Sequence, residues 1–327
     1  MATKRSRRQF LARLAGAAAS AIAATRRTAD GRTTARQSAA PARPQAPAPS
    51  NDRLRLVLLG TAGGPTPKLT RAAPAQVLLF RGAAYVVDCG NGVARQLRLA
   101  GVPLPSIRHV FLTHHHSDHN ADYGTLLLLA WASQLTTAVD TWGPPPLEKI
   151  TRLFLEMSET DIKVRMADEG RPALAPLVRS HEITEDGVVL DQGGLRITCA
   201  HVHHPLVDRA LAYRFDAAGR SIVISGDTSV TENLVRLAKN ADVLVHEALY
   251  VPAIEKHPAA LRRHLLDSHT PVEDVGRIAA EANVRTLVLS HFVPGETTAV
   301  PDSAWLEGAK KHFKGRVVVG RDLGEIT

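Results

Sequence analysis

Four candidate metal ligands, His114, His116, Asp118 and His119, occur within six residues, directly after an apolar run. Neutral imidazoles and a carboxylate are ligands that suit Zn²⁺ or a similar borderline cation. In an extended turn, alternate residues project to one side, so we expect His114 and His116 to converge on one ion. After the chain bends, Asp118 and His119 can face a second ion. Packing alone does not account for such a concentration of ligands, and the first hypothesis is a metal site.

Polar side chains that could complete this site follow three later apolar runs. They are His201, His203 and His204 after the first run, Asp227 after the second and His291 after the third. Side chains at the carboxyl ends of strands gather along one edge of a sheet, where functional sites usually form. We therefore expect these residues to meet the first histidine cluster.

The elements that must position these residues are short apolar strands alternating with helices. Strands are predicted at residues 54–59, 75–80, 84–88, 107–112, 195–200, 210–215, 221–225, 243–246, 286–289 and 316–319. Helices are predicted at residues 91–100, 121–132, 146–160, 230–239, 271–282 and 303–313. Residues 161–180 show no clear pattern. Two halves of mixed strands and helices predict a layered α/β protein.

In this order and spacing, the segments resemble the metallo-β-lactamase superfamily, in particular its ribonuclease Z and arylsulfatase-like branch. The resemblance covers roughly residues 54–320. It implies a four-layer αββα sandwich, classed as α/β (α+β), with metal ions at one edge. The segments that carry it are Leu59-Gly60-Thr61, Gly63-Gly64-Pro65, Val87-Asp88-Cys89-Gly90, the His114–His119 motif, Ala212-Tyr213-Arg214-Phe215, Gly226-Asp227-Thr228, His246-Glu247, Ser268-His269-Thr270 and Ser290-His291-Phe292.

The same resemblance implies a set of seven ligands and two Zn²⁺ ions, with other divalent metals left open. His204 is preferred to His203 because it stands at the family's distance before the segment that begins at Ala212. The implied ligands are His114, His116 and His204 for one ion, Asp118, His119 and His291 for the other, and Asp227 as a bridge between both.

A pair of divalent ions roughly 3.5–4 Å apart shares a water and lowers its pKa toward neutrality. We expect the resulting bridging hydroxide to attack a phosphorus, sulfur or carbonyl centre, while the ions neutralise the developing oxyanion. Asp118 can orient the hydroxide and take its proton. The resemblance further implies that His269, oriented by Glu247, donates a proton to the leaving group.

The formal charge of +8 is concentrated near the N-terminus. Residues 1–53 hold 11 of the 40 Lys and Arg residues but only two of the 32 acidic ones, so the remainder of the chain is near −1. A phosphate-backbone partner needs concentrated Lys and Arg. The body of the chain therefore gives no support for a nucleic-acid partner.

Transfer-RNA 3′ processing is the familiar activity of ribonuclease Z, and further features argue against it here. The segment between Asp118 and His204 has no Gly- and Lys-rich arm, and Ser117 stands where the ribonuclease usually has Gly. We expect a small ester of the aryl sulfate or phosphodiester type as the substrate, with nucleic acid unexpected. The alternative is a ribonuclease Z-like 3′ tRNA-processing endoribonuclease.

Another class of function is open, because some members of this fold carry iron and oxidise substrates and a few have lost activity. The alternatives are a mononuclear iron oxidoreductase and an inactive binding protein. The complete ligand set, with Glu247 and His269, favours a hydrolase. No Cys-x-Pro-x-Arg sequence occurs, so any sulfatase activity would have to come from the metals. The sequence leaves a homodimer open.

The first residues have the pattern of an export signal. Ser6-Arg7-Arg8-Gln9-Phe10-Leu11 carries the twin-arginine pattern, residues 10–24 are Ala-rich and mildly apolar, and Ala21-Ile22-Ala23 supplies a cleavage site. Residues 1–24 are therefore predicted to engage the twin-arginine export machinery. Residues 25–53 contain no large apolar residue and predict a disordered tether. We expect a hydrolase domain at residues 54–327, located in the periplasm or outside the cell.

Several other side chains receive structural roles. Asp88 is expected to support the metal site through hydrogen bonds. His115 is expected to point away from its neighbours, and Cys89 and Cys199 to be buried free thiols, although spacing alone does not exclude a disulfide. Core packing is favoured over an aryl pocket for the aromatic residues Tyr123, Trp131, Trp142 and Phe292.

Overall fold

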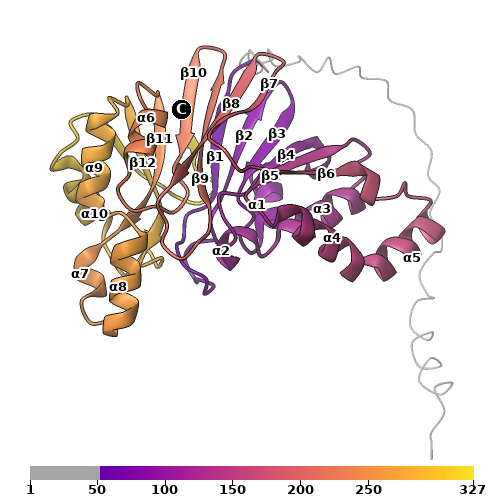
Figure 1. Ribbon diagram of the computed structural model, residues 1–327, viewed down its shortest axis with the longest axis horizontal. Helices are drawn as coiled ribbons and strands as arrows, with labels where there is room; N and C mark the ends of the chain where they lie inside the picture. Colours follow the sequence, from indigo (N-terminus) through magenta and orange to yellow (C-terminus); the bar gives the residue numbers. More distant parts are fainter. Residues whose placement is uncertain (1–51) are drawn as a thin grey trace, which may run out of the picture. The chain divides into compact units, whose positions relative to one another are not determined.

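Apolar, β-branched runs pair into two sheets that pack face to face in the computed structural model, with helices on both outer faces (Figure 1). The structure describes residues 52–327, so the predicted signal peptide and nearly all of the tether lie outside the described residues. The expected αββα sandwich is confirmed. No helix within residues 52–327 is long and apolar enough to cross a membrane.

The first sheet contains the strand that leads into the histidine cluster. Its strands lie in the order β14-β1-β2-β3-β4-β5-β6. Strands β3 to β6 are parallel neighbours, and β1 and β3 flank β2 in antiparallel pairing, so β1, β3 and β4 all run the same way. The strands are β1 (Arg55–Gly60), β2 (Ala75–Phe80), β3 (Ala83–Val87), β4 (Ile107–Phe111), β5 (Val139–Gly143), β6 (Val178–Glu182) and β14 (Glu325–Ile326).

The second sheet supplies the remaining candidate ligands. Its order is β13-β12-β11-β10-β9-β8-β7. Strands β10 to β13 are parallel, and β8 and β10 flank β9 in antiparallel pairing, so β8 also runs with them. The strands are β7 (Gly187–Gln192), β8 (Leu195–Val202), β9 (Ala210–Ala217), β10 (Arg220–Ile224), β11 (Val243–Leu249), β12 (Thr286–Val293) and β13 (Arg316–Val319).

Helices α1 and α3 pack on the first sheet, and α6, α9 and α10 pack on the second (Figure 1). Helices α7 and α8 follow β11, and the short α2 lies inside the histidine motif. The helices are α1 (Val93–Leu99), α2 (Ser117–Asn120), α3 (Tyr123–Ala132), α4 (Leu147–Met157), α5 (Glu159–Glu169), α6 (Glu232–Leu237), α7 (Val251–Ile254), α8 (Ala259–Ser268), α9 (Val272–Glu281) and α10 (Asp302–Lys310), with the 3₁₀ turns η3 (Leu104–Ser106) and η4 (Ala175–Leu177).

Buried apolar side chains fill the space between the sheets as well as the space under each helical layer. Between the sheets, the ring of Phe111 contacts Tyr213 and Phe215 edge to face, with centroids 5.3 Å and 5.5 Å away. The Tyr213 hydroxyl donates to the Leu112 carbonyl across the sheets (2.8 Å). These contacts fix the end of β4 against β9, immediately before the histidine motif.

Candidate metal centre

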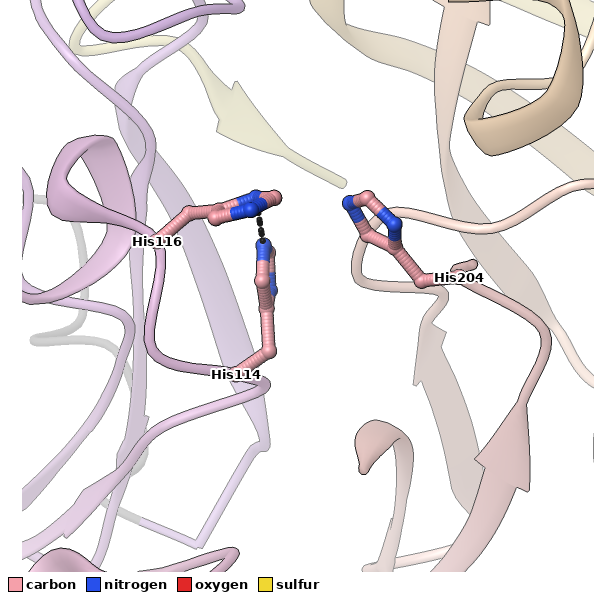
Figure 2. Close-up of side chains that lie close together, drawn as sticks. All are labelled: His114, His116 and His204. Carbon is pink, nitrogen blue, oxygen red and sulfur yellow. Dashed lines mark hydrogen bonds between the residues drawn. The ribbon is translucent and has the colours of Figure 1, made fainter. Parts of the chain in front are cut away.

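Three histidines from both sheets form the first cluster (Figure 2). Nε2 of His114 lies 3.0 Å from Nδ1 of His116 in the loop after β4. His204, after β8, faces them, with its ring centroid 5.1 Å from that of His114 and 4.8 Å from that of His116. One nitrogen of each ring lies within 4.8 Å of a nitrogen of each of the other two rings, so all three could bind one ion.

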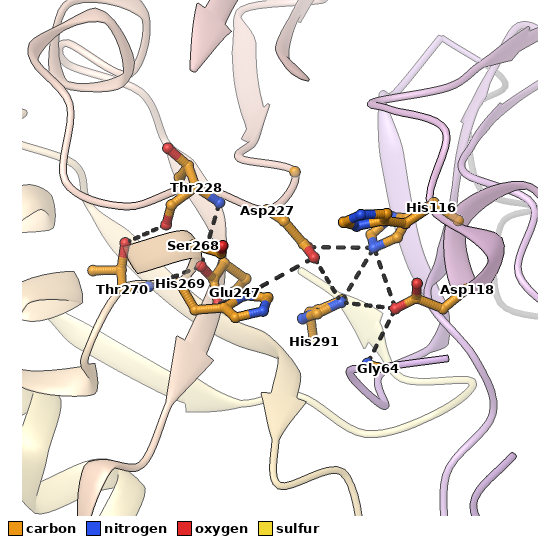
Figure 3. A network of polar contacts seen from close by, with 12 residues as sticks. Gly64, His116, Asp118, Asp227, Thr228, Glu247, Ser268, His269, Thr270 and His291 are labelled. Carbon is orange, nitrogen blue, oxygen red and sulfur yellow. Dashed lines mark hydrogen bonds and ion pairs between the residues drawn. The ribbon is translucent and has the colours of Figure 1, made fainter. Parts of the chain in front are cut away.

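Two carboxylates and two imidazoles form a second cluster beside the first (Figure 3). Nε2 of His119 lies 3.2 Å from Nε2 of His291 and 3.3 Å from Oδ1 of Asp227. Oδ2 of Asp118 lies 3.4 Å from Nε2 of His291. All four ligand atoms lie within 4.8 Å of one another, and all four side chains are buried.

Asp227 lies between the two clusters. Its Oδ2 is 3.2 Å from Nε2 of His291 in the second cluster and 4.0 Å from Nε2 of His114 in the first. A carboxylate in this position can contact two neighbouring cations at once. The structure therefore brings together all seven predicted ligands.

The protonation states of three of these ligands suit cations. Burial lowers the pKa of His204 to about 4 and that of His114 well below its usual range, so both rings are neutral at pH 7. Although burial opposes it, the neighbouring histidines His119 and His291 hold the pKa of Asp118 below its usual range. Neutral imidazoles beside an ionised carboxylate are the forms in which these side chains bind metal.

Unpartnered polar atoms provide the test of whether a metal pair fits. Both ring nitrogens of His204 and Oδ1 of Asp227 are buried without a hydrogen bond among the residues described. Leaving buried polar atoms without partners costs about 1–3 kcal/mol each. Divalent cations would satisfy these atoms together, so the donor set fits the predicted metals.

Hydrogen bonds from outside the clusters orient the ligands. The Asp88 carboxylate lies 2.8 Å from Nδ1 of His119 and also accepts from the backbone N–H of Thr113 (2.8 Å), in agreement with its predicted supporting role. The Thr113 hydroxyl lies 3.0 Å from Nδ1 of His114. The Gly64 N–H donates to Oδ2 of Asp118 (3.0 Å). The sequence assigned no role to Thr113, which directly precedes the histidine motif, or to Gly64, which lies within the segment Gly63-Gly64-Pro65.

Unusual backbone conformations occur at or beside two of the ligands, His291 and Asp227. Strands β11 and β12 shift register where Glu247 pairs with Ser290 and the next pair skips to Phe292. His291 is therefore the extra residue of a β-bulge, with a positive φ of 41°. Gly226, beside Asp227, has a φ of 60°, and a Cβ there would lie 2.7 Å from the Leu211 carbonyl oxygen. Only glycine fits this position without displacing its neighbours.

A histidine–carboxylate pair lies against the second cluster. Nδ1 of His269 is 3.3 Å from Oε2 of Glu247 and 3.9 Å from Oδ2 of Asp227. Glu247 is held by backbone N–H groups of Thr270 (2.9 Å) and Thr228 (3.3 Å) (Figure 3). Although burial lowers it, the carboxylates of Glu247 and Asp227 raise the pKa of His269 to about 9. A protonated His269 is suited to donating a proton.

Other histidines stay outside the clusters. His115 points away, with Nε2 2.7 Å from the Pro144 carbonyl oxygen. His203 is exposed, whereas the adjacent His204 is buried. His201 pairs with Asp186 (2.5 Å).

The remaining structural expectations are also met. Cys89 and Cys199 are buried free thiols. The aromatic residues considered for an aryl pocket belong to packing instead: Tyr123, Trp131 and Phe292 are fully buried, and Trp142 stacks on His181 with centroids 4.0 Å apart.

Comparison with known proteins identifies the family. The beta-lactamase superfamily domain matches residues 84–292. Ribonuclease Z of Mycobacterium marinum is 33% identical over 276 residues, which cover 84% of this chain and 98% of that protein. Ribonuclease Z of Mycobacterium avium is 34% identical with the same coverage. The chain belongs to the metallo-β-lactamase superfamily, in its ribonuclease Z branch. It is a metal-dependent hydrolase that acts on ester bonds.

Solved structures agree on the fold of this ribonuclease Z-branch hydrolase. The short form of human tRNase Z is 20% identical, with a TM-score of 0.64 over 84% of this chain and 98% of that chain. The metallo-beta-lactamase fold protein YhfI from Bacillus subtilis is 22% identical, with a TM-score of 0.63 over the same shares of the two chains.

The comparisons revise the expectation of a small ester substrate without nucleic acid. The ribonuclease Z relatives favour the ribonuclease Z-like alternative. The body charge, one of the features behind the first choice, describes the mean of the chain and not the site.

Proposed function

We propose that this hydrolase cleaves phosphodiester bonds in RNA, in the manner of ribonuclease Z. The observation that carries the proposal is the placement of His269 and Glu247 beside Asp227, which sets a proton donor next to the seven-ligand centre. The relatives named ribonuclease Z, matched over 98% of their length, support the choice of a phosphodiester over an aryl sulfate.

We further propose that the seven ligands hold two divalent cations, and that these are zinc. Five imidazoles and two carboxylates form the donor set, which suits zinc better than magnesium or calcium. When bound, such a pair lowers the pKa of a water molecule and neutralises charge on the phosphate oxygens.

Side chains of the protein then accept and donate the protons of the reaction. Oδ2 of Asp118 already accepts the Gly64 N–H, which fixes the carboxylate so that it can orient the attacking water and take its proton. As the new phosphorus–oxygen bond forms and the ester bond breaks, His269 transfers its proton to the departing oxygen. Glu247, fixed by Thr228 and Thr270, holds His269 in place.

The proposed site of action follows from the first residues, which lie outside the described range. We propose that residues 1–24 direct export by the twin-arginine machinery. The enzyme would then meet RNA outside the cytoplasm rather than precursor tRNA. Cell fractionation tests this: replacing Arg7 and Arg8 by Lys should retain the protein in the cytoplasm, and an unchanged distribution would contradict export.

A panel of substrates tests the reaction itself. The purified chain, loaded with zinc, is assayed on short RNA, precursor tRNA, a bis-aryl phosphate, an aryl sulfate and a lactone. We expect cleavage of the RNA and the bis-aryl phosphate, and loss of both activities in Asp227→Ala. Turnover of the aryl sulfate or the lactone, with no turnover of any phosphodiester, would contradict the proposal. A single bound iron would favour an oxidoreductase instead.

A further inference from the structure

A cavity opens beside the metal centre on the side of His269. It has a volume of about 450 Å³ and lies between the loop after His204 and helix α8. This volume falls within the range of roughly 300–1,000 Å³ that is typical of small-molecule sites. The residues that line it include Pro205, Leu206, Ala260, Arg263, His264 and Asp267. We call this cavity the α8 pocket.

The α8 pocket begins next to the proposed chemistry. The ring centroid of His264 lies 6.5 Å from that of His204 and 6.4 Å from that of His269. Ser268, which also lines the pocket, directly precedes His269. Because His269 is the proposed proton donor to the departing oxygen, a group in this pocket belongs to the departing part of the substrate.

The lining of the α8 pocket combines three kinds of chemistry. Arg263 supplies an exposed guanidinium cation. Asp267, one helical turn later, supplies an exposed carboxylate. Leu206 is fully exposed on the opposite wall, at a positive φ of 67°.

These three features match the parts of one nucleotide. A guanidinium binds a phosphate through charge-assisted hydrogen bonds. A carboxylate accepts hydrogen bonds from ribose hydroxyls, as acidic residues do in nucleotide-binding folds. Apolar side chains pack against the face of a base. A departing aryl group without charge would leave both charged groups of the pocket unused.

We propose that the α8 pocket binds the nucleotide that departs from the scissile phosphodiester, with Arg263 contacting its far phosphate and Asp267 its ribose. This inference rests on the proposed phosphodiester hydrolysis and adds a specificity site to it. The enzyme should therefore prefer a departing nucleoside that carries a second phosphate.

Dinucleotides that differ by one phosphate test the preference. The zinc-loaded full chain is assayed on UpU, pUpU and UpUp, and product analysis identifies the departing nucleoside. We expect the extra phosphate to raise kcat/KM by about tenfold only when it is on that nucleoside, and this preference to vanish in Arg263→Ala. Arg262→Ala is the matched control, since Arg262 does not line the pocket and donates to the Glu255 carbonyl; it should keep the preference.

A binding measurement separates this inference from the proposed reaction. Uridine 3′,5′-bisphosphate places one phosphate at the metal centre and the other at Arg263. By calorimetry it should bind about tenfold more tightly than either uridine monophosphate, and Arg263→Ala should abolish the difference. Absence of any phosphodiester cleavage, with this binding preference intact, would overturn the proposed function but support the pocket. Equal binding of bisphosphate and monophosphates, or an equal preference in Arg263→Ala, would overturn the pocket.

Discussion

The carboxylate of Asp88 lies 2.8 Å from Nδ1 of His119, and both side chains are buried. This contact leaves Nε2 of His119 to face His291 and Asp227. Asp88 also accepts from the Thr113 N–H, so a single carboxylate ties the end of β3 to the histidine motif after β4. Outer contacts of this kind set the orientation and the basicity of a metal-binding imidazole.

Asp88→Asn should therefore weaken binding at the second metal site by roughly 10–100-fold. The amide keeps the shape of the side chain but removes the charge that faces His119. Competition with a chromophoric zinc chelator measures the change. Asp140→Asn is the matched control, because Asp140 forms the same 2.8 Å contact with His181 away from the site. Equal effects of the two substitutions would contradict the role given to Asp88.

His269→Ala should reduce kcat by about 10²–10⁴-fold on an alkyl phosphodiester, because the departing alkoxide then lacks a proton donor. The loss should be far smaller on a bis-nitrophenyl phosphate, since nitrophenolate departs without protonation. Steady-state kinetics on the two substrates give the comparison. The same loss on both would indicate that His269 serves the site in another way, such as supporting Asp227.

The strands and the first histidine cluster could be predicted because their signals are local, whereas the family resemblance implied the full ligand set. Apolar runs mark the strands, and most ligands follow strands that run the same way within their sheet, whereas His291 lies inside β12. The histidine motif needed only its own six residues. The family resemblance separated His204 from His203 through the family's distance to the next strand, and the structure buries His204 while leaving His203 exposed.

Other features depend on information that the periodic pattern does not contain. Helix α5 falls mostly in the segment without a clear pattern, because none of its side chains is buried. It carries ion pairs one turn apart instead, including those of Arg165 with Asp161 and Glu169. The β-bulge at His291 depends on strand pairing, and the role of Arg263 depends on the loop after His204, which is distant in sequence.

The two thiols offer a test of the buried core. Burial raises the pKa of Cys199 to about 11, and Cys89 is buried completely. At pH 8 the thiolate form of Cys199 is scarce, so neither thiol should react with Ellman's reagent in the folded chain. Both should react after unfolding in guanidinium chloride. Rapid reaction of the folded chain at pH 8, or fewer than two thiols after unfolding, would be inconsistent with this packing.

Removing the metals should lower the melting temperature. A ligand that binds only the folded chain stabilises it by about 4 kcal/mol at a thousandfold excess over its Kd. For a domain of this size, that corresponds to a loss of roughly 10 °C on chelation. Calorimetry with and without EDTA measures the shift, and re-added zinc should restore it. An unchanged melting temperature would mean that the clusters do not hold metal tightly.

The number of bound metal ions tests the central claim most directly. Mass spectrometry of the zinc-saturated chain should find two ions per chain, with His203→Ala unchanged and His204→Ala losing one, because His204 completes only the first cluster. Two ions in His204→Ala, or fewer than two in the unmodified chain, would contradict a dinuclear centre built from these seven residues.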